Sequence, residues 1–185
     1  MKTFIAVACL TFCCAAFAKE VAGVQFPQTV SVEGKTLSLN GAGLRTKLIF
    51  KVYAAGLYVE TPSHDAAQLL VSDQIKRVEM RMLRDLEKGK IIEAIEAGFE
   101  KNAKAQLPAL KDRLARFTAQ ISDLKEGQGL VLTYVPGKGT AVAVTGGKET
   151  FVEGKDFSDA LFSVWLGKEP VDGGLKKELL SGPTS

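Results

Sequence analysis

The alternation of hydrophobic and polar residues predicts strands in the first third of the chain. Residues 30–40 (VSVEGKTLSLN) alternate on both sides of a Glu-Gly pair, a pattern typical of a hairpin. Residues 48–60 follow as a long strand whose two alternating sets of side chains are both mainly apolar. Such a strand is expected at the centre of a sheet with both faces covered, and its small residues 54–56 leave room for a close approach.

Helical spacing of apolar residues replaces this alternation in the middle and at the end of the chain. Ser63 is the expected cap of a short helix over 64–71, and Pro108 the expected first residue of a longer one. The other expected elements are a strand at 75–83, a helix at 88–105, strands at 130–136, 140–145 and 149–154, a helix around 157–164, and a last helix capped by Asp172.

This order of elements predicts an α+β domain with an antiparallel β-sheet packed with helices. Strands come first, helices follow, and a meander precedes the last helices, without alternating βαβ units. The glycines of GAG (41–43) and GKG (137–139) do not open helices after strands, so they are not phosphate-binding fingerprints. We expect residues 19–185 to form a single domain.

The first 18 residues have the composition of a signal peptide. A short positive start and an apolar run lead to Ala-Phe-Ala, which predicts cleavage after Ala18 and a periplasmic or secreted protein. The three cysteines (Cys9, Cys13 and Cys14) all lie in this segment, so we expect neither a disulfide nor thiol chemistry. With His64 as the only histidine, a transition-metal site and a Ser-His triad are not expected, and we predict neither a metal nor a cofactor.

Charge and hydropathy further limit the classes of partner. The formal net charge is +3, and cationic and acidic residues are interspersed, which does not indicate nucleic acid or an anionic membrane surface. After the leader, no apolar run approaches the length of a membrane span, so stable membrane insertion is not expected. No pattern indicates an oligomeric state.

Several blocks of the sequence resemble one family. GAGLR at 41–45, followed by VYAAGLYVE at 52–60, is similar to the core signature of the chalcone isomerase fold. The block at 157–180 resembles its C-terminal helix, turn and helix, and residues 84–102 resemble its central helix. The resemblance covers about 26–180, and the exported, cysteine-free form is similar to the bacterial chalcone isomerase-like branch. It implies an open-faced β-sandwich.

The resemblance also implies where a site would lie. The catalytic arginine of the family matches Arg45, its catalytic threonine falls on Tyr53, and its late threonine falls near Val164. Its tyrosine and asparagine fall near Ile91 and Gly98. Because only the arginine is retained, the donors that would stabilise a developing enolate are missing, and we do not expect a true chalcone isomerase.

The retained arginine with a nearby tyrosine resembles the non-catalytic, fatty-acid-binding branch of the fold. Arg45 would bind a carboxylate through two charge-assisted hydrogen bonds, with Tyr53 as a third donor. Ile91 and Val164 would then line the apolar part of the ligand site. We therefore expect a non-catalytic protein that binds a small amphipathic ligand, such as a fatty acid.

Two other functions remain open at this point. One is an isomerase or intramolecular lyase acting on a small conjugated carbonyl compound, and the other is a structural or protein-interaction domain. Arg45 could equally form a surface ion pair, and Tyr53 could simply pack on the sheet. A turn expected at residues 46–47 interrupts the strand alternation that would decide whether Arg45 faces the interior.

Overall fold

A computed structural model describes residues 18–182, so the predicted signal peptide lies outside the described residues apart from Ala18. Within them, seven strands form one antiparallel sheet in chain order, which confirms the expected sheet. These strands are β3 (Thr29–Val32), β4 (Lys35–Lys47), β5 (Phe50–Val59), β6 (Lys76–Met82), β7 (Gly129–Val135), β8 (Gly139–Val144) and β9 (Thr150–Val152). A separate hairpin, β1 (Ala18–Val21) with β2 (Val24–Pro27), precedes the sheet.

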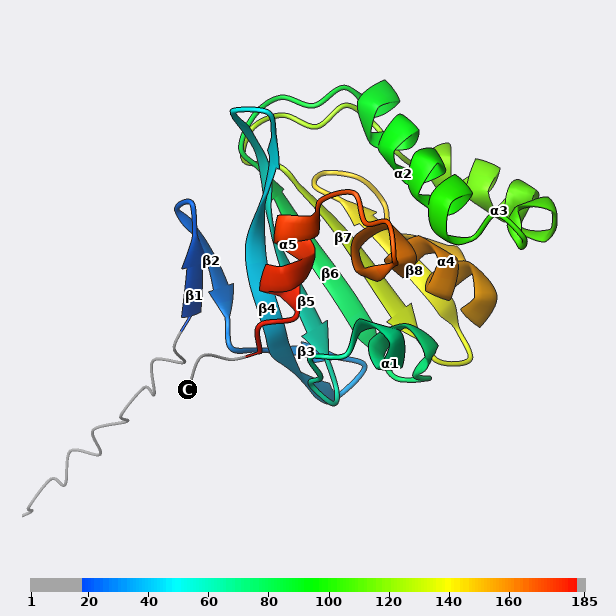
Figure 1. The fold of residues 1–185 in the computed structure, drawn as a ribbon, viewed down its shortest axis with the longest axis horizontal. Coiled ribbons are helices and arrows are strands. Elements are labelled where there is room, and N and C mark those ends of the chain that lie inside the picture. Colours follow the sequence, from blue (N-terminus) through cyan, green and yellow to red (C-terminus); the bar gives the residue numbers. More distant parts are fainter. Residues whose placement is uncertain (1–17, 183–185) are drawn as a thin grey trace, which may run out of the picture.

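Helices cover one face of this curled sheet, and the β1–β2 hairpin lies on the other side of β4 (Figure 1). The helices of the described chain are α1 (Ala66–Val71), α2 (Lys88–Asn102), α3 (Leu107–Thr118), α4 (Lys155–Leu166) and α5 (Gly173–Leu179). Each of them contributes buried apolar side chains to the main core, together with β5 to β8. The architecture is therefore the predicted α+β arrangement of an antiparallel sheet packed with helices.

Strand β5 is a central strand with two covered faces, as its sequence predicts. Tyr53 and Leu57 belong to the core on the helix side, whereas Tyr58 belongs to a smaller core under the β1–β2 hairpin. A Cβ atom on Gly56 would lie 2.6 Å from the ring of Phe26, which comes from β2. The small residues of β5 thus make room for the protein's own hairpin at this position, and not for a ligand.

The turn between β4 and β5 lies two residues later than expected. β4 continues through the GAGLR segment as far as Lys47, with a register shift between Arg45 and Thr46. Leu48 and Ile49 form the turn and do not begin the next strand as predicted, and they are 90% and 87% exposed. Their apolar character concealed the turn because turns usually carry glycine, asparagine or aspartate.

The short helix α1 begins at Ala66 and not at residue 64, because its cap is Asp65. The Asp65 carboxylate accepts hydrogen bonds from the backbone N–H groups of Ala67 (2.8 Å) and Gln68 (3.2 Å). Ser63, the predicted cap, instead accepts a hydrogen bond from the Asp65 N–H and donates one to Gln68. Aspartate satisfies two free N–H groups of the first turn directly, which decides where the helix starts.

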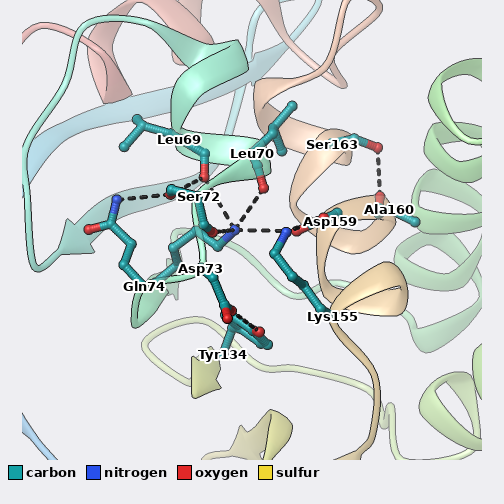
Figure 2. A network of polar contacts seen from close by, with 11 residues as sticks. Leu69, Leu70, Ser72, Asp73, Gln74, Tyr134, Lys155, Asp159, Ala160 and Ser163 are labelled. Carbon is teal, nitrogen blue, oxygen red and sulfur yellow. Dashed lines mark hydrogen bonds and ion pairs between the residues drawn. The ribbon is translucent and has the colours of Figure 1, made fainter. Parts of the chain in front are cut away.

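The other end of α1 is held by a fully buried lysine that the sequence pattern did not single out. The Nζ atom of Lys76, on β6, donates to the carbonyl oxygens of Leu69, Leu70 and Ser72 at 2.9–3.2 Å. It also lies 3.4 Å from the Asp159 carboxylate on α4. Figure 2 shows these oxygens converging from the two helices. The partial negative charge of the carbonyls at a helix C-terminus offsets part of the cost of burying this cation.

Candidate functional site

Arg45 and Tyr53 are neighbours across the β4–β5 pair. Their Cα atoms are register partners, and the guanidinium carbon of Arg45 lies 5.4 Å from the centre of the Tyr53 ring. Tyr53 belongs to the core on the helix side of the sheet. Arg45 therefore lies on that same side, which settles the orientation that the strand pattern alone left open.

Two carboxylates hold the strand on both sides of Arg45. The backbone N–H of Leu44 donates to Glu178 (2.7 Å), and that of Thr46 donates to Asp172 (3.2 Å). β3 pairs only with the beginning of β4, so these acceptors cover a part of the strand edge that lacks a strand partner. Asp172 also caps α5, as predicted, and this links the position of Arg45 to the C-terminal helix.

The glycines before Arg45 allow that helix to lie directly on β4. A Cβ atom at Gly41 would collide with the backbone of Leu179, and one at Gly43 would collide with the side chain of Glu178. Close packing of α5 thus explains the glycines of the GAG segment. This agrees with the prediction that the segment is not a phosphate-binding loop. Close approach of a second backbone is a common reason for glycine within a strand.

The hydroxyl group of Tyr53 is fixed by the only tryptophan of the chain. Trp165 Nε1, on α4, donates a hydrogen bond of 2.9 Å to the Tyr53 oxygen. Burial raises the pKa of Tyr53 above its usual value, although the positive charge of Arg45 acts in the opposite direction. The phenol therefore keeps its proton near neutral pH. Because its oxygen already accepts from Trp165, its own O–H remains a donor for another group.

All four predicted ligand-binding residues line one small interior cavity of about 30 Å³. Arg45 and Tyr53 come from the sheet, Ile91 from α2, and Val164 from α4. Trp165 is buried and lines the same cavity. Apart from Arg45, Tyr53 and Trp165, the lining is apolar: Met80, Met82, Leu86, Ile91, Ala94, Ile95, Leu124, Leu130, Val164 and Val171.

Two positions where the resemblance implies polar residues in the family are used here for helix packing. A Cβ atom on Gly98 would lie 2.7 Å from Val164, so the absence of a side chain lets α2 approach α4 closely. Asn102, the nearest asparagine, does not line the cavity. Its amide donates to the carbonyls of Gly98 and Glu169 and accepts from the Glu169 N–H, which ties α2 to the segment before α5.

Arg45 also borders two hollows on the surface. One, of about 330 Å³, lies between the β4–β5 turn and the segment that leads into α2. The other, of about 190 Å³, lies between α2 and the segment before α5. Lys47 and Lys90 line both of them. The guanidinium is thus at the point where an apolar interior meets a basic entrance.

Sequence reasoning missed Glu178 and the second role of Asp172, because both depend on contacts with β4 that are more than a hundred residues away in the chain. Lys51 is exposed and lines neither the cavity nor the two hollows around Arg45. Among residues 18–182, no three acidic, histidine or cysteine side chains are grouped to hold a metal ion. None of the helices in this range is long and apolar enough to cross a membrane.

Comparison with known proteins identifies the family. The chalcone isomerase-like family matches residues 18–181. No curated protein matches this chain. Among solved structures, a fatty-acid binding protein of Arabidopsis thaliana is similar in fold, with a TM-score of 0.65 and 17% identity over 86% of this chain and 92% of that one. The cavity between the sheet and helices, with Arg45 at its edge, therefore lies in a protein that belongs to the chalcone isomerase-like family.

Proposed function

We propose that this protein binds a fatty acid or a similar amphipathic carboxylate without transforming it. The observation that carries this proposal is the position of Arg45, a cation between an apolar cavity and two surface hollows. Within residues 18–182, no carboxylate forms an ion pair with its guanidinium group. A ligand carboxylate would supply the partner, and the apolar lining would take the chain.

The geometry suits a carboxylate head group. An arginine can donate two parallel hydrogen bonds to one carboxylate, and the free O–H of Tyr53 can donate a third. The guanidinium is half-buried, and such a partly shielded charge pair is stronger than one in open water. Each methylene that leaves water on binding would add about 0.8 kcal/mol.

A bound acyl chain of any length requires the protein interior to open. Ligand sites usually measure about 300–1,000 Å³, whereas the cavity measures about 30 Å³. Met80 and Met82 line it, and methionine side chains adapt their shape at little cost. We propose that the acyl chain of the ligand enters past Arg45 and Leu86, which border both the cavity and the larger hollow.

The cavity lining favours binding over the isomerase alternative. Tyr53 is the one candidate for a general acid in the lining, and its raised pKa makes it a poor proton donor. No carboxylate or histidine among the lining residues could accept a proton from a substrate. Small conjugated enones can be screened as substrates. Turnover of any of them that is lost in both Arg45→Ala and Tyr53→Phe would nevertheless favour an enzyme.

Calorimetric titration with laurate and with dodecanol tests the proposal. Both probes carry the same chain, but only laurate has a carboxylate. We expect Arg45→Gln to weaken laurate binding by roughly 10- to 100-fold, the range of a lost charge-assisted pair, and to leave dodecanol nearly unchanged. Arg81→Gln is the matched control, because Arg81 pairs with Ala54 and so lies on the other side of the sheet.

Two outcomes would refute this function. If neither laurate nor palmitate binds the native protein, the carrier hypothesis fails and the structural or protein-interaction alternative gains support. If laurate binds equally to the native protein and to Arg45→Gln, the head group lies elsewhere. Native mass spectrometry of freshly purified protein adds a check, because a bound species of fatty-acid mass should be depleted in Arg45→Ala.

We further propose that binding takes place in the periplasm or after secretion. The support is the sequence of residues 1–18, which is typical of a cleaved signal peptide. Fractionation followed by intact-mass measurement tests it. Protein that begins at Lys19 and is found outside the cytoplasm is expected, and full-length protein in the cytoplasm would overturn it.

A further inference from the structure

Three consecutive apolar side chains are exposed at the turn between β4 and β5. Leu48, Ile49 and Phe50, here called the tip, are 90%, 87% and 51% exposed. Two other large apolar side chains of the described residues are exposed, Val71 and Phe151, and each is isolated in the sequence. Single exposed apolar residues are ordinary in proteins, but a contiguous group marks a surface for interaction.

The conformation of the tip gives a second reason to expect a partner. Leu48 has a φ of 57°, in the left-handed region that glycine and asparagine adopt most easily. A leucine at this position is unfavourable for the backbone and also exposes its side chain to water. Neither the turn geometry nor the core of the protein accounts for it, whereas contact with an apolar phase would.

Cations surround the tip. Lys47 and Lys51 flank it in the sequence, and the Arg84 guanidinium carbon lies 4.8 Å from the centre of the Phe50 ring. The larger hollow behind the tip is lined by four cationic residues, Arg45, Lys47, Arg84 and Lys90, and by two acidic ones, Asp85 and Glu87. Asp85 is already paired with Lys125 at 2.8 Å. The interspersed charges of the sequence did not indicate this grouping, which arises only on folding.

We infer that the tip is a docking site for the surface of an anionic phospholipid bilayer. The apolar side chains would enter the boundary between head groups and acyl chains, and the surrounding lysines and arginines would contact the phosphates. The turn and the segment entering α2 lie at the same end of the molecule (Figure 1), so docking would bring the larger hollow and Arg45 to the lipid surface. A ligand could then pass from membrane to protein without crossing water.

Sedimentation of the purified protein with vesicles tests this inference. Vesicles of phosphatidylcholine mixed with phosphatidylglycerol should retain the protein, and vesicles of phosphatidylcholine alone should retain much less. We expect the double variant Leu48→Ser, Ile49→Ser to bind the anionic vesicles at least about tenfold more weakly. Val71→Ser is the matched control, since it removes an equally exposed apolar side chain from α1, at the other end of the sheet (Figure 1).

Charge and oligomeric state complete the test. Lys47→Glu should also weaken binding to anionic vesicles, and added salt should have the same effect, whereas Lys111→Glu on α3 should not. Equal vesicle binding by the native protein and the tip variant would overturn the inference. So would self-association that depends on the tip without vesicle binding, which would assign the tip to a second copy of the chain. No fatty acid is present in this assay, so its result is independent of the carboxylate site.

Discussion

Replacing Lys76 with methionine should destabilise the protein, because Lys76 is a buried cation that holds two helices. Its Nζ donates to three carbonyls at the C-terminus of α1 and lies next to Asp159 on α4. Methionine has a similar length and no donor. Figure 2 shows that the acceptors belong to both helices, so their connection through this amine would be lost.

The magnitude follows from the acceptors that would be left without a donor. The Leu69 carbonyl still accepts from the Ser72 hydroxyl at 2.9 Å, but the carbonyls of Leu70 and Ser72 have no other donor within the described chain. Each buried acceptor left unpaired costs about 1–3 kcal/mol. Removing the burial cost of the charged amine offsets part of this, so we expect a net loss of about 2 kcal/mol near neutral pH.

The pH dependence has a defined sign. Burial lowers the pKa of Lys76 below its usual 10.5, although Asp159 acts in the opposite direction. Between the two values the unfolded chain binds more protons than the folded one, so this group makes stability rise with pH. The cost of the buried charge is present in full below the folded pKa and disappears as the pH approaches 10.5. The advantage of the native protein over Lys76→Met should therefore grow in alkaline solution.

Urea unfolding followed by the fluorescence of Trp165, the only tryptophan, measures these differences. Lys155→Met is the matched control: Lys155 pairs with the same Asp159 carboxylate at 2.6 Å but is 34% exposed, so its loss should cost at most about 0.5–1 kcal/mol. Equal losses in the two variants, or a native advantage that shrinks as the pH rises, would refute this explanation of the buried amine.

Three further changes test the packing around the cavity, each by urea unfolding. Gly98→Ala should destabilise by about 1–3 kcal/mol because its methyl group meets an α4 side chain at 2.7 Å, whereas Gly89→Ala, with nothing within 4 Å on the same helix, should stabilise by up to about 1 kcal/mol. Tyr53→Phe should cost about 1–3 kcal/mol because the Trp165 N–H loses its acceptor. Phe26→Ala should cost about 3–5 kcal/mol and speed proteolysis of the β1–β2 hairpin. An unchanged free energy of unfolding in the Gly98, Tyr53 or Phe26 variant would contradict the contact described for that residue.

The candidate site was predictable in its residues but not in its dimensions. The resemblance of GAGLR and the following strand was enough to select Arg45 and Tyr53, and the structure brings both to one cavity with Ile91 and Val164. The size of that cavity depends on side chains from several elements that meet only on folding. Sequence periodicity reports which residues are apolar, and it does not report how completely they fill the space between them.

Errors in the predicted elements occurred where side-chain chemistry overrides periodicity. The helix expected after Ser63 begins later because Asp65 provides a better acceptor for the first-turn N–H groups. The strand expected from Leu48 begins later because Leu48 and Ile49 form a turn, although neither is a usual turn residue. The room for a close approach at Gly56 is occupied by Phe26, from a hairpin that the alternation pattern did not reveal.

The sequence by itself determined the class of the fold, because segments with the strand period and segments with the helix period follow in grouped order, without βαβ alternation, and this order favours an antiparallel sheet packed with helices. It also selected Arg45 and Tyr53 as candidate ligand-binding residues, because the blocks around them resemble one family. Tertiary structure alone decided that Arg45 faces the helices and that Lys76 is buried. The apolar turn and its cations likewise become one surface only on folding. Each of these depends on contacts between distant segments, and such contacts leave no periodic signal in the chain.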